Sequence, residues 1–237
     1  MHALAFVAAC VASGMGCAQA SAPATAKDVP YPGTFTLEVD LREAPRRIYC
    51  MHETIPVSPG PLPRYYPKWP LPDHAPDGSI ANIAGPVITA NGKPVPWRRD
   101  VEDMYTLSLD VPPGADHIGL TFQYPSPGPG VWYSHEVWST PHPVDLDPTQ
   151  VTFYPGGYYA RDTPIRPTVV LPSGWQFATA MEVASRSGDA VHFKPMSFNN
   201  FIDSPLIAGE YFRRVDLAPG DTTPVHLNIA QKVDVAN

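Results

Sequence analysis

Two histidine–glutamate pairs are the residues of this sequence most suited to metal chemistry. A zinc peptidase of the helical type needs His-Glu-x-x-His, in which two histidines four residues apart share a helix face and the glutamate activates the metal-bound water. The pair His52-Glu53 has Pro56 at the position of the second histidine, and proline would also break the helix. The pair His135-Glu136 has Ser139 there. Neither segment therefore completes such a zinc site.

Other catalytic patterns are also incomplete. His135 and His142 lie near Glu136 and Asp145, but in a proline-broken segment where no regular element holds them together, so we expect no metal site. The sequence contains no Gly-x-Ser-x-Gly elbow, phosphate-binding Gly-x-x-x-x-Gly-Lys loop or Gly-x-Gly-x-x-Gly turn. Its 23 acidic residues leave open a glycosidase with two carboxylates, which only folding could pair. We predict no catalytic residue, metal or cofactor, and therefore no enzyme.

Two aromatic-rich segments are candidates for binding. In Tyr-Tyr-Pro-Lys-Trp-Pro at 65–70, we expect alternate rings to pack in the core, with a sugar- or peptide-binding platform as the alternative. Trp132, Tyr133 and Trp138 fall in a segment with the composition of a loop, and exposed aromatic residues on loops often mark contact sites. These three residues form a candidate ligand loop for a peptide or a glycan.

The elements that would position these residues are predicted to be strands. The 31 prolines disfavour long helices, because the proline ring removes an amide donor and clashes with the preceding turn. Residues 34–40 alternate apolar Phe35, Leu37 and Val39 with polar residues, which indicates a half-buried strand. Such segments recur about every 10–15 residues with turn residues between them. We predict an all-β fold, an antiparallel β-sandwich of about ten to thirteen strands with long Pro-rich loops.

The strand pattern also predicts particular boundaries. Asn91-Gly92 predicts a tight hairpin, because both residues accept the positive φ that a type I′ turn requires. The segment 177–185 fits a short helix or a strand, and 124–148 is a long excursion from one sandwich. Further strands are predicted at 46–57, 62–69, 85–90, 94–99, 105–111, 118–124, 151–154, 165–171, 190–193, 210–217 and 224–230.

Charge and hydropathy exclude two classes of partner. The net charge is −7, whereas nucleic acids and anionic membrane surfaces attract clustered lysine and arginine. No segment reaches the roughly 20 consecutive apolar residues that a membrane-spanning helix needs. We therefore expect no nucleic-acid partner and no membrane span.

The first 20 residues have the pattern of a secretory signal peptide. They contain no charged side chain apart from His2, residues 3–12 are apolar, and Ala18-Gln19-Ala20 is a small-x-small cleavage pattern. We expect export to the periplasm or outside the cell with cleavage after Ala20, with lipidation at Cys17 as the alternative. The rest divides into a leader at 21–30, a single β-sandwich domain at 31–231 and a tail at 232–237. The mature chain would keep only Cys50, which cannot form an internal disulfide.

Six motifs occur in a fixed order along the chain. They are Glu-Val-Asp-Leu at 38–41, Tyr-Tyr-Pro-Lys-Trp at 65–69, Asn-Gly-Lys-Pro-Val-Pro-Trp at 91–97, Tyr-Pro-Gly-Gly-Tyr at 154–158, Leu-Pro-Ser-Gly-Trp at 171–175 and Asp-Ser-Pro-Leu-Ile-Ala-Gly-Glu-Tyr at 203–211. The series resembles the amino-terminal β domain of the glycyl aminopeptidase family of PDZ-containing zinc metallopeptidases. The resemblance extends over nearly all of residues 31–230.

The resemblance implies a domain without catalytic residues. In that family the all-β domain precedes a thermolysin-like zinc domain, which carries the catalytic residues, and then a PDZ module. Because the sequence stops at Asn237, we expect an orphaned or truncated domain that serves as an interaction or substrate-framing module. Its partner would be a zinc peptidase catalytic domain encoded separately. The candidate interface residues are Tyr66, Lys68, Trp69, Arg98, Arg99 and Tyr158, with core packing or a solvated strand end as the alternative.

The sequence departs from the family pattern at three places. Where relatives have a Pro-Gly turn directly after the tryptophan, Trp69 is followed by Pro-Leu-Pro-Asp-His at 70–74. Asp147-Pro148 replaces an Asn-Trp pair, and residues 125–143 form an excursion unlike that of the relatives. These changes affect the surface that would meet a catalytic domain. A second class of function therefore stays open: a stand-alone exported β-sandwich that binds a peptide or glycan through the Trp132–Trp138 loop.

Overall fold

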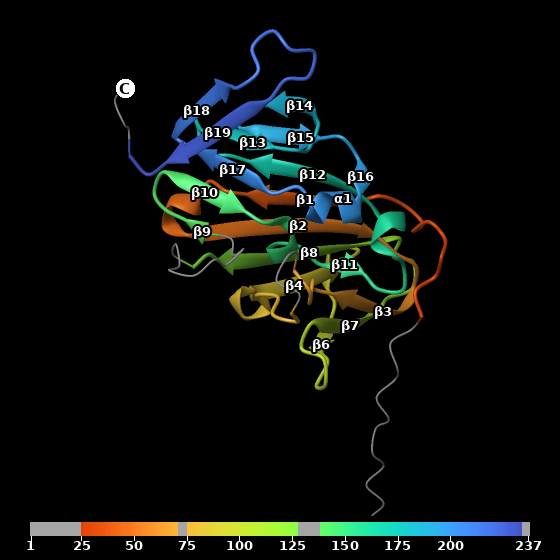
Figure 1. Cartoon of the computed structure of the whole chain (residues 1–237). Coiled ribbons are helices and arrows are strands. Elements are labelled where there is room, and N and C mark those ends of the chain that lie inside the picture. The colour runs from red at the N-terminus through yellow and green to blue at the C-terminus, as the bar shows by residue number, and fades with distance from the viewer. Residues whose placement is uncertain (1–24, 71–74, 128–137, 234–237) are drawn as a thin grey trace, which may run out of the picture.

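The computed structural model describes residues 25–70, 75–127 and 138–233 (Figure 1). The predicted signal peptide, residues 21–24 of the leader, Trp132 and Tyr133 lie outside these ranges. Strands dominate the described residues, so the prediction of an all-β fold is confirmed. The helices have one turn or so each, namely α1 (Phe198–Ile202), η1 (Ala44–Arg46), η2 (Ile80–Asn82), η3 (Pro148–Gln150) and η4 (Ala160–Asp162).

One layer of the sandwich is a nine-stranded sheet. Its inner face is apolar because alternate residues of each strand point the same way, as with Phe35, Leu37 and Val39, which are all buried. The strands lie in the order β14 (Val183–Ser187), β15 (Ala190–Phe193), β12 (Pro164–Val170), β1 (Phe35–Asp40), β2 (Ile48–Pro56), β8 (His117–Pro125), β4 (Ala84–Ala90) and β5 (Lys93–Pro94), and β16 (Met196–Ser197) pairs with β12.

Two four-stranded sheets pack on this inner face. Phe177 of the first sheet meets Phe193 of the large sheet, and Phe153, which precedes a strand of the second sheet, meets Phe122. The first sheet contains β13 (Gln176–Thr179), β17 (Leu206–Gly209), β10 (Pro143–Leu146) and β9 (Trp138–Ser139), and the second contains β11 (Tyr154–Pro155), β3 (Gly60–Tyr65), β7 (Thr106–Val111) and β6 (Trp97–Arg99). Together with the large sheet they enclose one hydrophobic core.

A two-stranded ribbon completes the fold. It consists of β18 (Tyr211–Asp216) and β19 (His226–Gln231). The ribbon lies at the end of the molecule opposite to β3, β6 and β7 (Figure 1). The two ends of the sandwich therefore carry different surfaces.

The hairpin prediction is confirmed. Asn91 and Gly92 have φ of 51° and 72°, and they join β4 to β5 through the pair Ala90–Lys93. These positive φ values match the two-residue turn that Asn-Gly favours.

Two details of the predicted sandwich are corrected. The described residues form nineteen strands rather than ten to thirteen, partly because prolines divide predicted strands. Segment 94–99, for example, is split into β5 and β6 in different sheets around Pro94 and Pro96, which lack the amide donor that a ladder needs. The pairing is also not wholly antiparallel, because β1 runs parallel to β12. The ambiguous segment 177–185 contributes to β13 and β14 and forms no helix.

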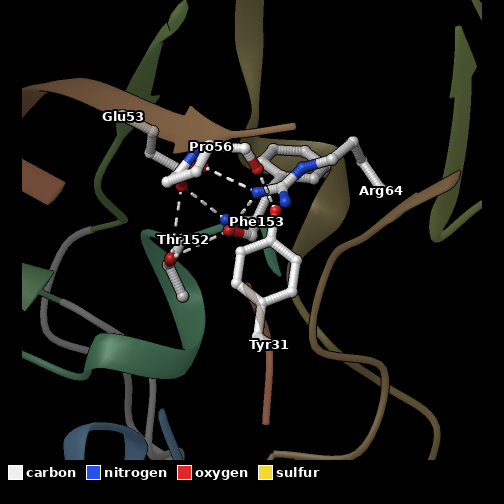
Figure 2. Close-up of polar contacts among 6 residues, drawn as sticks. All are labelled: Tyr31, Glu53, Pro56, Arg64, Thr152 and Phe153. Carbon is white, nitrogen blue, oxygen red and sulfur yellow. Dashed lines mark hydrogen bonds and ion pairs between the residues drawn. The ribbon is translucent and has the colours of Figure 1, made fainter. Parts of the chain in front are cut away.

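A buried ion pair connects the large sheet to the second small sheet (Figure 2). Glu53 of β2 and Arg64 of β3 both have fully buried side chains, and Arg64 Nη2 donates to Glu53 Oε2 at 3.1 Å. The same nitrogen donates to the carbonyl oxygen of Phe153 at 2.7 Å. Glu53 Oε1 accepts from the backbone N–H of Phe153 at 2.6 Å and from Thr152 Oγ1 at 3.2 Å. One carboxylate and one guanidinium thus fix three segments.

Burial dominates the electrostatics of this pair. It raises the pKa of Glu53 to about 7, although the Arg64 charge and the donors from Phe153 and Thr152 oppose that rise. Burial likewise lowers the pKa of Arg64. Since both ions lose their hydration, the pair holds the segments in register at a substantial desolvation cost.

We expect Arg64→Met to lower the free energy of unfolding by about 3–5 kcal/mol near pH 8, because Glu53 would be buried without its counterion. Urea unfolding measures this change. Arg42→Met, which removes the exposed ion pair with Asp40, is the control and should cost no more than about 1 kcal/mol. Adding Glu53→Gln to Arg64→Met should recover part of the lost free energy of unfolding. If Arg64→Met and Arg42→Met lowered the free energy of unfolding equally, a structural role for the buried pair would be contradicted.

A second prediction concerns pH. The pKa of Glu53 is raised from 4.5 to about 7, so the folded state holds the proton over a range in which the unfolded state has released it. The wild-type free energy of unfolding should therefore fall, relative to that of Glu53→Gln, as pH rises from about 4.5 to about 7, by on the order of 3 kcal/mol. Urea unfolding of both proteins across this range gives the difference. A wild-type free energy of unfolding that does not fall relative to that of Glu53→Gln over this range would mean that Arg64, not burial, determines the pKa of Glu53.

Candidate functional site

The outer face of the second small sheet forms a groove of about 1080 Å³. Leu107 and Leu109 of β7 and Arg64 of β3 are buried, so the intervening residues of these strands face outward. The outward residues form three cross-strand pairs, Pro61–Asp110, Pro63–Ser108 and Tyr65–Thr106. Because Ser108 and Thr106 are small, the middle of this face is hollow.

The flanking strands close the groove at its sides. Tyr154 of β11 pairs with Tyr65 of β3, and their rings meet at 5.8 Å with an interplanar angle of 65°. On the other side, Arg98 of β6 pairs with Ser108. The groove therefore has an aromatic wall on β11 and a cationic side chain on β6.

Aromatic residues after β3 extend the first wall. Tyr66 is buried, stacks on Tyr105 at 6.4 Å and donates its hydroxyl to the carbonyl oxygen of Gln150 at 2.8 Å. Trp69, in contrast, is 60% exposed at the rim of the groove. Burial raises the pKa of Tyr154 to about 12 and also raises that of Tyr105. Both phenols are therefore neutral at physiological pH, and the Tyr105 hydroxyl donates to the carbonyl oxygen of Pro76 at 2.9 Å.

Charged residues surround the end of the groove nearest Thr106. Lys68 Nζ lies 3.2 Å from Asp103 Oδ1 and 5.6 Å from the centre of the Tyr105 ring. Asp100 Oδ1 accepts the backbone N–H groups of Glu102 and Asp103 at 2.8 and 2.9 Å, which lowers the pKa of Asp100. The loop that follows β6 is thus held in place by its own carboxylate.

The structure places five of the six candidate interface residues around the groove. Tyr66, Lys68, Trp69, Arg98 and Tyr158 line it, whereas Arg99 is exposed on β6 beside it. Tyr66 is buried in the core, which agrees with core packing as the alternative to an interface role. Trp69 is exposed and does not belong to the core. Tyr158 is half-buried, with its ring edge-on to Tyr31 at 5.0 Å.

The other sequence candidates lie elsewhere. Trp132, Tyr133 and His135 fall outside the described residues, and Trp138 opens β9, where its backbone pairs with Asp145. His142 Nδ1 lies 2.7 Å from Glu210 Oε2, on another sheet from the groove. Within residues 25–70, 75–127 and 138–233, no three His, Cys, Asp or Glu side chains are grouped as a metal site would require.

Sequence reasoning missed the contribution of β7. Thr106, Ser108 and Asp110 alternate with buried Leu107, Leu109 and Val111. This alternation predicted the strand, but a polar face of this kind is equally typical of a plain solvent-facing surface. Only the pairing of β7 with the aromatic and proline residues of β3 identifies it as the floor of a groove.

None of the curated proteins matches this chain, and the part of the chain that the structure describes contains no helix long and apolar enough to cross a membrane. An aminopeptidase N family protein from Idiomarina loihiensis has a similar fold, with a TM-score of 0.71 and 13% identity. That match covers 84% of this chain but only 33% of the other.

A second structure is less similar. The M1 zinc metallopeptidase from Deinococcus radiodurans gives a TM-score of 0.40 at 16% identity, over 84% of this chain and 48% of the other. The chain thus spans between a third and a half of the length of these proteins. A family model described as the Peptidase M61 N-terminal domain matches residues 36–210, which is most of the sequence. This chain belongs to the peptidase M61 N-terminal domain family.

Proposed function

We propose that this chain is a non-catalytic β domain that associates with a zinc-peptidase catalytic domain and frames the approach to its active site. The observation that carries the proposal is the family match over residues 36–210. The first His-Glu pair supports it, because Glu53 lies on a strand and is used in the buried pair with Arg64. In this position the carboxylate holds β2, β3 and Phe153 together and does not face a substrate.

The face around the groove is the surface proposed for the catalytic domain. Trp69 is exposed at this groove, Arg98 of β6 also lines it, and Arg99 is exposed on the same strand. Tryptophan and arginine are the residues that most often dominate the energy of protein interfaces. Neither arginine makes a side-chain hydrogen bond or ion pair with other described residues, so both are available to a partner.

A stand-alone exported binding protein for a peptide or glycan is the second candidate. The observation that favours it is the groove, whose aromatic wall is open without any second domain. In this case the Trp132–Trp138 loop would provide a further contact surface. Absence of any association with a catalytic domain, together with ligand binding that depends on Trp132 and Trp138, would favour this candidate.

Export with cleavage after Ala20 is part of the proposal, and it rests on the sequence pattern of residues 1–20. Protein recovered from the periplasm or medium of the expressing cells should begin at Ser21, as measured by intact-mass spectrometry. A lipid-modified chain that begins at Cys17 would support lipoprotein processing instead. An intact residue 1 on cytoplasmic protein alone would contradict export.

Association with a catalytic domain is the main prediction. The purified chain with zinc should release no glycine from an amino-terminal glycine substrate, but it should bind a separately produced His-Glu-x-x-His domain of the same organism in analytical ultracentrifugation. Trp69→Ala should weaken that binding about tenfold or more, as expected for an interface tryptophan. Leu217→Ala, which truncates an exposed apolar residue directly after β18 of the ribbon at the other end of the molecule, is the matched control. Glycine release by the chain alone, or no binding of the catalytic domain, would contradict the proposal.

A further inference from the structure

The charges along the groove follow a pattern. Asp110 lies at one end of β7, and Glu102 lies in the loop at the other end, where the backbone N–H of Asp100 donates to the carbonyl oxygen of Thr106. Thr106 and Asp110 are four residues apart on one strand, which corresponds to about 13 Å at about 3.3 Å per residue. Arg98 lies between them, opposite Ser108. The groove therefore presents negative, positive and negative charge in turn along the strand direction.

The end charges are available to a ligand. Among the described residues, neither Glu102 nor Asp110 makes a side-chain hydrogen bond or ion pair, whereas Asp103 is paired with Lys68. Because the groove is lined by four carboxylates and only two cationic side chains, its field attracts positive charge. A ligand with a cation at each end and no cation in the middle would complement this pattern.

The apolar part of the groove is suited to an extended chain. Pro61 and Pro63 on β3 are rigid, and the Tyr65 and Tyr154 rings are held edge to face. Rigid rings and prolines bind an extended polypeptide at low cost in side-chain entropy, as in grooves that recognise extended peptides. In an extended peptide, residues i and i+4 point to the same side at about 13 Å separation. That spacing matches the distance along β7 from Thr106, beside the loop that carries Glu102, to Asp110.

We infer that the groove binds an extended segment of a peptide substrate that carries basic side chains four residues apart and an apolar residue midway between them. The basic residues pair with Glu102 and Asp110, and the apolar residue lies over Pro63 and beside the Tyr65 ring. This inference rests on the proposed function, because the peptide is the substrate that the associated zinc domain would cleave. The groove would then favour cationic peptides and hold them extended.

The test uses three blocked pentapeptides, acetylated and amidated at their ends. Lys-Ala-Leu-Ala-Lys has the required spacing, Lys-Lys-Leu-Ala-Ala has the same composition with adjacent charges, and Glu-Ala-Leu-Ala-Glu reverses the charge. In titrations of the full chain followed by NMR or calorimetry at low ionic strength, we expect the first to bind at about 0.1–1 mM, about threefold tighter than the second and at least about tenfold tighter than the third. Equal binding of the first two peptides, or tighter binding of the acidic one, would overturn the inference.

Variants test the residues. Glu102→Gln with Asp110→Asn should weaken the first peptide about fivefold to tenfold and remove its advantage over the second. Asp189→Asn with Asp221→Asn, which neutralises two exposed carboxylates on other parts of the fold, is the matched control and should leave affinity unchanged. The inference would be overturned if the first peptide bound the Glu102→Gln, Asp110→Asn variant as tightly as the wild type. It would also be overturned if a neutral oligosaccharide competed with the peptides and bound more tightly than any of them.

These results remain separable from those on the proposed function. Peptide binding is measured without a catalytic domain, and association is measured without peptide. Loss of peptide binding with intact association overturns only the substrate inference. Peptide binding without association overturns the proposed partner, and with it the role of the peptide as a substrate, but it leaves the assignment of the groove as a peptide site.

Discussion

The burial of Glu53 against Arg64 imposes the strictest constraint on this fold. Neither ion has access to water, so each depends on protein groups. Phe153 provides both a donor and an acceptor, whereas Arg64 Nε and Nη1 have no hydrogen-bond partner among the described residues. The carboxylate fixes the segment before β11, and the guanidinium fixes β3. Hydrophobic packing alone would leave the two layers more freedom to slide, because it is not directional.

This constraint extends to the opposite face of the small sheet. With Arg64 pointing inward, its strand neighbours Pro63 and Tyr65 must point outward. With Phe153 held by Glu53 and Arg64, Tyr154 follows at a fixed place beside Tyr65. One wall of the groove is therefore formed by the outward residues of β3, whose inward residue Arg64 makes the ion pair, and by Tyr154, which follows the anchored Phe153. A change in one face is expected to reach the other.

The sequence predicted the fold well and the site in part. Period-2 alternation identified most strands, and Asn91-Gly92 identified a turn, because both signals are local. Pairing across the chain is not local, so the parallel contact of β1 with β12 and the ion pair were missed. Arg64 occupies an inward position of a proline-interrupted strand, where a charge breaks the expected pattern. The candidate residues Lys68, Trp69 and Arg98 came from resemblance, whereas their neighbours on β7 had no distinguishing signal.

The parallel pairing of β1 with β12 has a consequence for how the chain acquires its structure. Phe35 pairs with Ile165, more than half of the chain later, whereas β1 and β2 are adjacent in sequence. During synthesis β1 can form a hairpin with β2 early, but its second edge stays open until β12 has emerged. Long-range pairings of this kind slow folding, and an open edge is prone to intermolecular pairing in the meantime. The nascent chain thus has a prolonged vulnerable period, in which a chaperone that covers the edge of β1 would increase the yield of folded protein.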